Sequence, residues 1–422
     1  MRMIFSPSKL QGTLPAIPSK SDAHRALICA ALSDGPTRLQ MPDWPAQDIQ
    51  ATIRCLEALG ARIERTGGVL LIKPIDQPRE MPVLDCGESG STLRFLLPVA
   101  AALGRGALVT GSGRLPRRPM APLLKSLRAG GVKIEGDALP LRLEGRLTSG
   151  IYQLPGDVSS QFVSGLLFAL PVLPEGGTVL VSEKLQSAAY VDMTLETLAR
   201  FSVQVKKLPD GYRVMPAQRY LTPGTYKVEG DWSNMAFFLC AGALSGPVTC
   251  TGLPKDCLQA DRAVARLLAR FGARVTQEES RITVSPGTLR AIKADLSQIP
   301  DLAPPLAVVA SAARGRTLLF GAGRLRMKES DRLRTVTAML RALGADVTEG
   351  PDTLTITGRP ELSGGPVDAA GDHRIAMAAA IAASRCAGET VLEGTEAVEK
   401  SYPSFYNDYS LLGGKCHVVN HR

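Results

Sequence analysis

Residues suited to binding anions lie at the polar starts of several apolar segments. The first start, Pro18-Ser-Lys20-Ser21-Asp22-Ala-His24-Arg25, combines two cations with a hydroxyl group. A lysine at a helix N-terminus opposes the helix dipole, so it is unusual there unless an anion binds. Ser21 and Arg25 are four residues apart and would share one helix face. The pattern indicates an anion site, and the structural alternative is a solvated lysine beside a serine cap.

Two further starts carry glycine, hydroxyl groups and an amide. In Gly87-Glu-Ser-Gly90-Ser-Thr-Leu-Arg94, small residues precede an apolar segment, as they do in phosphate- or carboxylate-binding turns. A plain cap with a flexible turn is the alternative there. Ser159-Ser160-Gln161 is expected to cap a helix, and the same side chains would also suit a phosphate.

The other three starts contain aspartates. Asp231 is expected to be an N-cap. Asp301, in Ile299-Pro-Asp301-Leu-Ala-Pro304, also fits a cap with proline in the first turn, but a carboxylate on a cationic face is a candidate general base as well. In Asp372-His373-Arg374 an arginine again opposes the dipole, which indicates an anion.

Three charged loops add candidate cations and a candidate acid. Arg118 lies in a loop rich in glycine and proline, and Lys400 lies in the last loop before the final helix. In Met327-Lys328-Glu329-Ser330-Asp331-Arg332, helical spacing would put Lys328 and Arg332 on one face with Glu329 beside Arg332. Such turns are usually solvated, so a functional interpretation depends on their positions at the junctions of a repeat.

That repeat has a period of about 70 residues. A motif Leu-x-x-x-Gly-x-x-Val/Ile recurs where an amphipathic helix runs into a strand, and small-residue apolar helices follow the six polar starts. A helix that is apolar nearly all round is buried. Each unit therefore contains a buried helix, a strand, an amphipathic helix and a strand or hairpin such as residues 61–72.

The length of 422 residues exceeds what one hydrophobic core supports. Two domains of three units each are predicted, with a seam near residues 226–230. The first ~18 residues could supply a strand to the second domain. If the buried helices of each half run parallel, their N-termini share one face, which their dipoles would make positive.

The composition limits the classes of function. The net charge of +9 favours anionic partners, and the low aromatic content of 5% argues mildly against single-stranded nucleic acid. No apolar run reaches the ~18 residues of a membrane span, and no secretory signal is seen, so we expect a cytoplasmic protein without a membrane partner. Eight cysteines without a Cys-x-x-Cys pair, and four histidines without metal-ligand spacing, favour reduced thiols and no metal.

Together these motifs resemble those of the 5-enolpyruvylshikimate-3-phosphate (EPSP) synthases, of the enolpyruvyl transferase superfamily, over essentially the whole chain. The matching motifs, in family order, are Lys20-Ser21-x-x-x-Arg25, Gly90-x-x-x-Arg94, Arg118-Pro119, Ser159-Ser160-Gln161, Lys328-Glu329-x-Asp331-Arg332, Asp372-His373-Arg374 and Lys400-x-x-Pro403. The resemblance implies an α/β fold of six βαβαββ repeats, three in each domain, with the active site in the interdomain cleft. The expected domains are 1–18 plus 229–422, and an inserted domain, 19–228.

The implied reaction transfers the enolpyruvyl group of phosphoenolpyruvate (PEP) to the 5-hydroxyl of shikimate 3-phosphate, without a metal or redox cofactor. From the placement of the charges we expect no nucleic-acid partner, and we expect a monomer. Asp301 would take the hydroxyl proton, Glu329 would protonate the methylene carbon, and Lys20 would steady charge on the carboxylate and the departing phosphate. The residues implied to hold shikimate 3-phosphate are Ser21, Arg25, Ser159, Ser160, Gln161, Ser187, Tyr190 and Lys328. Those implied to hold PEP are Lys20, Gly90, Arg118, Gln161, Arg332, Arg374 and Lys400.

Some positions depart from the common family pattern. His24, Glu88-Ser89, Phe95 and Ala188-Ala189 differ from the usual residues, and Arg324 stands where an asparagine often contacts the shikimate phosphate. The changes around Gly90 leave sensitivity to the PEP mimic glyphosate open.

Two other functions are considered. The sister transferase that acts on UDP-N-acetylglucosamine carries a catalytic cysteine on the loop matching residues 111–120, and this loop has none. A non-catalytic, basic nucleic-acid-binding repeat protein would expose its cations along one face, whereas here they gather at helix starts beside acids.

Overall fold

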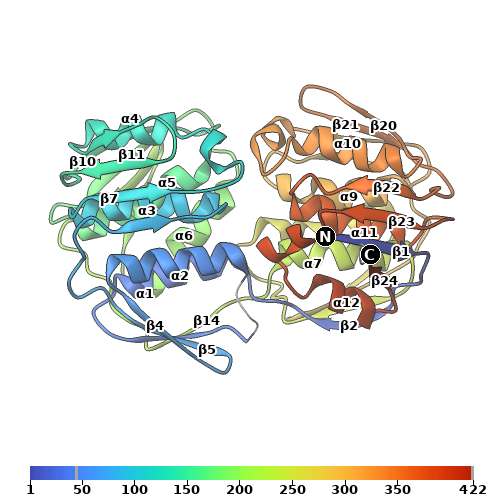
Figure 1. Cartoon of the computed structure of the whole chain (residues 1–422), viewed down its shortest axis with the longest axis horizontal. Helices are drawn as coiled ribbons and strands as arrows, with labels where there is room; N and C mark the ends of the chain where they lie inside the picture. The colour runs from blue at the N-terminus through green and yellow to red at the C-terminus, as the bar shows by residue number, and fades with distance from the viewer. Residues whose placement is uncertain (43–45, 420–422) are drawn as a thin grey trace. The chain divides into compact units, whose positions relative to one another are not determined.

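The computed structural model describes residues 1–42 and 46–419. The chain divides into two compact units (Figure 1). Unit 1 is Met1–Ile17 together with the chain from Glu229 onward, and unit 2 is Pro18–Val228. Pro18, which was expected in the discontinuous domain, lies with unit 2.

Six helices form the centres of the two units, three in each. Apart from polar residues near their N-terminal ends they are mostly apolar, and nearly every residue in them is buried, as the sequence predicts. They are α1 (Lys20–Ala31), α3 (Gly90–Leu103) and α5 (Ser160–Ala169) in unit 2, and α7 (Trp232–Leu244), α9 (Ala303–Ala310) and α11 (His373–Ala383) in unit 1.

Small residues let these helices approach closely. A Cβ atom on Gly165 of α5 would come within 2.2 Å of the backbone oxygen of Arg94 in α3, so a larger residue would force the two helices apart. Such close packing favours the small side chains that dominate these segments.

A second set of six helices is amphipathic or only partly buried. These helices follow the first strand after each central helix. They are α2 (Gln47–Leu59), α4 (Ala121–Ala129), α6 (Ala188–Arg200), α8 (Ala263–Phe271), α10 (Arg332–Ala342) and α12 (Phe405–Leu411).

Each unit has three four-stranded sheets of one common design. The first pair of strands in each sheet is parallel and the other two pairs are antiparallel. In unit 2 the orders are β14 (Thr225–Lys227), β3 (Thr37–Gln40), β5 (Val69–Lys73), β4 (Arg62–Thr66); β6 (Val83–Asp85), β7 (Ala107–Thr110), β9 (Leu141–Glu144), β8 (Lys133–Glu135); and β10 (Gly150–Pro155), β11 (Gly177–Ser182), β13 (Gly211–Val214), β12 (Val205–Leu208).

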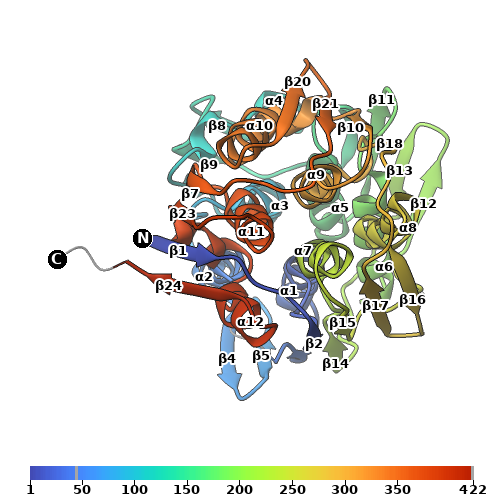
Figure 2. The same cartoon turned by 90° about the vertical axis from the view of Figure 1, so that its right-hand side faces the viewer.

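The sheets of unit 1 incorporate the start of the chain. Strand β1 (Arg2–Ser6) lies between β23 (Thr390–Glu393) and β24 (Lys415–Val418), and β2 (Gly12–Pro15) pairs with β15 (Val248–Thr251) (Figure 2). The prediction that the first residues supply a strand to the second half is confirmed. The orders are β2, β15 (Val248–Thr251), β17 (Arg281–Ser285), β16 (Arg274–Gln277); β18 (Lys293–Asp295), β19 (Arg316–Phe320), β21 (Leu354–Thr357), β20 (Asp346–Glu349); and β22 (Gly365–Asp368), β23 (Thr390–Glu393), β1, β24 (Lys415–Val418).

Five of the six central helices begin at a side-chain N-cap. Ser19, Ser89, Ser159, Asp231 and Asp372 each accept a hydrogen bond from a backbone N–H in the first turn. The exception is α9, which a short 3-10 helix, η4 (Pro300–Leu302), precedes. The prediction that Asp301 caps this helix is wrong, because its carboxylate binds cations instead.

The helix starts meet within each unit. In unit 2, Gln161 near the start of α5 bonds to Ser91 and Arg94 near the start of α3. In unit 1, Arg374 near the start of α11 bonds to Ser233 near the start of α7 and to the backbone oxygen of Asp301 before α9. Within each unit, side chains near neighbouring helix starts therefore contact one another. Within the described ranges, no helix is long and apolar enough to cross a membrane.

Candidate active site

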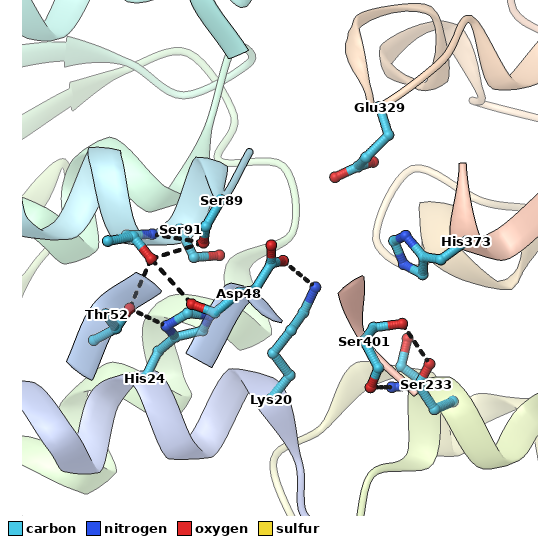
Figure 3. Close-up of polar contacts among 12 residues, drawn as sticks. Lys20, His24, Asp48, Thr52, Ser89, Ser91, Ser233, Glu329, His373 and Ser401 are labelled. Carbon is cyan, nitrogen blue, oxygen red and sulfur yellow. Dashed lines mark hydrogen bonds and ion pairs between the residues drawn. The ribbon is translucent and has the colours of Figure 1, made fainter. Parts of the chain in front are cut away.

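Lys20 opens α1 and pairs with a carboxylate. Its Nζ lies 2.7 Å from Asp48 Oδ2, and its side chain is only 17% exposed (Figure 3). The solvated-lysine alternative is therefore wrong. Asp48 lies in the first turn of α2, where a negative charge suits the helix dipole. The pair holds the ammonium group at the start of α1 despite the unfavourable dipole.

Arg25 is buried beneath the start of α1. It donates to the backbone oxygen of Ser21 at 2.5 Å, to Thr194 Oγ1 at 2.9 Å and to the backbone oxygen of Tyr190 at 2.7 Å. The shared face of Ser21 and Arg25 is confirmed. Burial lowers the pKa of Arg25 to about 10, which leaves it charged at neutral pH. Arg25 thereby joins α1 to α6, the helix that carries Tyr190.

Ser187 occupies the N-cap position of α6 in a left-handed conformation, with φ of 56°, and is buried. A left-handed serine is uncommon outside turns and functional loops. Ser159 and Ser160 are also buried, at the start of α5.

Gln161 is held at both ends of its amide. Arg94 donates to its Oε1 at 2.8 Å, and its Nε2 donates to Ser91 Oγ at 2.8 Å. These contacts fix the orientation of the amide at the point where α3 and α5 begin. Arg94 and Ser91 support a predicted site residue without having been predicted themselves.

Gly90 lies directly under the guanidinium group of Arg118. A Cβ atom at Gly90 would come within 2.4 Å of Arg118 Nη1. The absence of a side chain therefore decides where the arginine lies, since only glycine leaves room for it. This contact brings the predicted turn and the predicted loop cation together.

In unit 1, Asp301 is the centre of a cluster of opposite charges. Asp301 Oδ1 lies 2.7 Å from Arg332 Nη1 and 3.4 Å from Lys328 Nζ. Asp301 Oδ2 lies 3.5 Å from Arg374 Nη2. Burial alone would raise the pKa of Asp301, but Arg374, Lys328 and Arg332 together hold it well below its usual range. The carboxylate is therefore ionised at neutral pH.

Arg332 is enclosed by three carboxylates and is 1% exposed. Its shortest contacts are 2.7 Å to Asp301, 2.5 Å to Glu329 and 2.8 Å to Asp372. Burial alone would lower the pKa of Arg332, but Asp372, Glu329 and Asp301 raise it.

Lys328 and Arg332 do not share a helix face, so that prediction is wrong. Lys328 follows the 3-10 helix η5 (Gly323–Met327) in an extended conformation, and α10 begins only at Arg332, with Asp331 as its cap. The two cations come together because both contact Asp301. Burial lowers the pKa of Lys328 to about 8, although Asp301 opposes the shift.

Arg374 and Lys400 complete the predicted cations of unit 1. Arg374 donates to Ser233 Oγ at 2.8 Å and to the backbone oxygen of Asp301 at 3.3 Å. Lys400 is buried at the end of the 3-10 helix η6 (Thr395–Lys400). Arg324 lies in η5, one turn before Lys328.

Several supporting residues were missed as site residues. Asp48 contacts Lys20, and Ser233 contacts Arg374. Asp372 accepts hydrogen bonds from two nitrogens of Arg332 and also caps α11. Asp261 is a further buried carboxylate. Burial and the negative charge of Asp301 raise the pKa of Asp261 to about 6. An acid at a helix start was visible for Asp372, but its partner lies 40 residues away.

The fold has close relatives of known structure. An EPSP synthase from Acinetobacter baumannii superposes with a TM-score of 0.83 at 25% identity, covering 99% of this chain and 100% of that one. The enolpyruvyl transferase NikO from Streptomyces tendae gives a TM-score of 0.79 at 20% identity, covering 99% of this chain and 98% of that one. The protein thus has the two-domain enolpyruvyl transferase fold.

Sequence comparison narrows the class further. The family model described as EPSP synthase (3-phosphoshikimate 1-carboxyvinyltransferase) matches residues 4–409. A 3-phosphoshikimate 1-carboxyvinyltransferase of Clostridium kluyveri is 43% identical, with 97% of each chain covered, and one of Clostridium perfringens is 40% identical, with 98% of each covered. The chain belongs to the EPSP synthase family.

Proposed function

We propose that this protein transfers the enolpyruvyl group of PEP to the 5-hydroxyl of shikimate 3-phosphate and releases inorganic phosphate. Family membership supports the reaction, and the cluster around Asp301 is the structural observation that carries it. In that cluster two candidate acid–base carboxylates, Asp301 and Glu329, lie against the same arginine. Paired carboxylates among cations suit a reaction of anions that needs proton transfer in both directions.

The proposed first step is an addition. The 5-hydroxyl oxygen attacks C2 of PEP while Asp301 takes the hydroxyl proton, and Glu329 protonates the methylene carbon to make a methyl group. Arg374, Lys328 and Arg332 hold the pKa of Asp301 low, and an ion with so low a pKa is a weak base. Anionic substrates that engage those cations would raise this pKa and strengthen the base.

The second step is an elimination. Glu329 recovers a proton from the methyl carbon while the bond between C2 and the phosphate oxygen breaks, which restores the enol double bond. The departing phosphate takes the proton that Asp301 removed from the 5-hydroxyl, so both carboxyl groups return to their starting states. The proposed reaction needs no metal or redox cofactor, because both substrates already carry the groups that react. Lys20, steadied by Asp48, would balance charge on the carboxylate and the departing phosphate.

Substrate binding is assigned by the family motifs. For shikimate 3-phosphate we propose Ser21, Arg25, Ser159, Ser160, Gln161, Ser187, Tyr190 and Lys328. For PEP we propose Lys20, Gly90, Arg118, Gln161, Arg332, Arg374 and Lys400. Arginines suit this task because the guanidinium group grips carboxylates and phosphates with two parallel hydrogen bonds.

We also propose that the two units are the two domains of the enzyme, and that it acts as a cytoplasmic monomer. Eight free cysteines, seven of them buried, suit a reducing compartment. The helix starts present acids beside their cations, which favours small anionic substrates over a nucleic-acid backbone.

The test is phosphate release from PEP by the purified protein in EDTA, with and without shikimate 3-phosphate. Release that needs both substrates is expected. Release supported by UDP-N-acetylglucosamine alone would assign the sister activity instead. A folded protein that releases no phosphate with either acceptor would contradict the proposal.

A further inference from the structure

A line of buried polar side chains runs through unit 2 from His24 to the start of α3. His24 Nδ1 lies 2.8 Å from Thr52 Oγ1 (Figure 3). Thr52 Oγ1 lies 2.7 Å from Thr92 Oγ1. Thr92 Oγ1 in turn contacts Ser89 Oγ at 2.7 Å and the backbone oxygen of Asp48 at 3.3 Å. All these side chains are buried, so each bond is shielded from water.

The donor and the acceptor of each hydrogen bond in this line can be assigned by starting from Thr92. Thr92 has one hydroxyl proton, which it donates to Ser89 Oγ or to the backbone oxygen of Asp48. Its oxygen must then accept from Thr52, because a hydroxyl group donates only once. Thr52 has therefore used its own proton, and its oxygen must accept from His24. His24 must carry a proton on Nδ1.

The surroundings of the other ring nitrogen, Nε2, indicate the same tautomer. Nε2 of His24 is buried and has no hydrogen-bond partner within the part of the chain that the structure describes. A proton there would be a buried donor without an acceptor, which is costly. Burial and the nearby charges of Lys20 and Arg25 also lower the pKa of His24 well below its ordinary value. His24 is thus neutral, with Nδ1–H as its single donor.

The line ends at two groups of the proposed PEP site. Ser89 caps α3 and directly precedes Gly90, so the line fixes the turn over which Arg118 lies. Asp48, whose backbone oxygen faces Thr92, holds the ammonium group of Lys20 through its carboxylate. Loss of these hydrogen bonds would let both the Gly90 turn and the Lys20 side chain move.

We propose that His24, as the Nδ1–H tautomer, is a positioning residue that orders the Thr52–Thr92–Ser89 line and thereby sets the affinity for PEP. This inference rests on the proposed function, and it adds a residue that touches neither substrate. Because the line ends at the Gly90 turn and at Lys20, the effect falls on PEP and spares shikimate 3-phosphate.

Two matched pairs of variants test the proposal. Asparagine can place an amide donor near the position of Nδ1, whereas leucine has a similar size and no donor. His24→Leu should raise the KM for PEP by about tenfold, and His24→Asn by less than about threefold. Thr52→Val should act like His24→Leu, and Thr52→Ser should act like the wild type. The KM for shikimate 3-phosphate should change by less than about threefold in all four.

A spectroscopic measurement tests the tautomer without relying on turnover. In protein labelled with ¹⁵N-histidine, the His24 signals, identified by their loss in His24→Asn, should report a protonated Nδ1 and a bare Nε2. A proton on Nε2 would overturn the proposal, as would equal KM values for PEP in His24→Leu and His24→Asn.

The two proposals fail in different ways. A wild-type protein without phosphate release would contradict the proposed function, and the tautomer and direct calorimetric binding of PEP would still decide the role of His24. Thermal melts identify any variant that does not fold. If one variant of a pair does not fold, the KM values for PEP are compared within the other pair.

Discussion

Arg332 Nε lies 2.8 Å from Asp372 Oδ2, and the two side chains are 1% and 0% exposed. Arg332 also donates to Asp301 and Glu329, while Asp372 also accepts from Ser330 and caps α11. A buried arginine needs such partners, because an uncompensated charge in the interior is costly. Asp372 therefore sustains the cluster around Asp301 while touching none of the proposed reacting atoms.

The first prediction follows from this pair. Asp372→Asn keeps a residue able to cap α11 but removes the charge, so the free energy of unfolding should fall by ~3 kcal/mol. Urea unfolding at neutral pH measures the loss. The matched control is Asp331→Asn, at the cap of α10, whose pair with Arg326 is about 30% exposed and should cost less than ~1 kcal/mol. Equal losses in both variants would contradict the assignment.

The second prediction concerns the proposed proton donor. Glu329→Gln preserves the shape of the side chain but cannot exchange a proton with carbon, so kcat should fall by at least ~100-fold. Substrate affinity, measured by calorimetry, should change by less than about threefold. Glu278→Gln alters an exposed carboxylate of the same unit and serves as control. A kcat within a few-fold of the wild type would remove Glu329 from the mechanism.

The third prediction concerns the room above Gly90. Gly90→Ala would push the Arg118 guanidinium group aside, because the new Cβ would come within 2.4 Å of Nη1. The KM for PEP should rise by about tenfold or more, while stability changes little, since a long side chain can move. Gly150→Ala, which adds a methyl group in open space, should leave both unchanged. An unaltered KM for PEP in Gly90→Ala would separate Arg118 from PEP binding.

The fourth prediction is a pH dependence. With a pKa of about 8, Lys328 is charged below that pH and becomes neutral above it. The affinity for the anionic shikimate 3-phosphate should therefore fall as the pH rises through about 8, and kcat/KM reports this in the free enzyme. Lys328→Arg should move the decline to higher pH, because arginine stays charged. A wild-type profile that is flat up to pH 9 would exclude this role.

The fifth prediction uses Asp261, with a pKa of about 6 in the folded protein. An ordinary aspartate in the unfolded chain has a pKa near 3.9, so the folded state holds the proton more tightly. This group therefore favours folding at low pH, and its contribution is lost as the pH rises from about 4 to about 6. Relative to the wild type, Asp261→Asn should gain up to ~3 kcal/mol of stability between pH 4 and pH 7. Melts at both pH values test it, and a constant difference would refute it.

Much of the architecture could be predicted from local patterns. The apolar helices, the glycine that follows every amphipathic helix except α6, where Ser202 stands, and most N-caps depend on nearby residues, so periodicity alone locates them. The contacts of Asp301 could not be predicted from local patterns. Its spacing favours a helix cap, but cations from two distant segments draw the carboxylate away from the helix start.

The supporting residues were hidden for the same reason. Asp48 and Thr52 lie on the buried face of α2 beside Ala51 and Cys55, but a polar residue at such a position gives no sign of which partner it contacts. Their roles arise from contacts with Lys20, His24 and Thr92, which are 28 to 40 residues away in the chain. Only the packing of three helices brings these groups together.

The placement of β1 and β2 has a consequence for synthesis of the chain. Met3 pairs with Leu392, so β1 waits for β23 while the chain between them is made, or roughly 20–80 s at typical elongation rates. Unit 2 draws all its strands from its own segment and can fold meanwhile. A growing chain thus carries a folded unit 2 and an unpaired, half-apolar β1, which is open to wrong pairing. Strand β1 is made before unit 2 and reaches its partners after it.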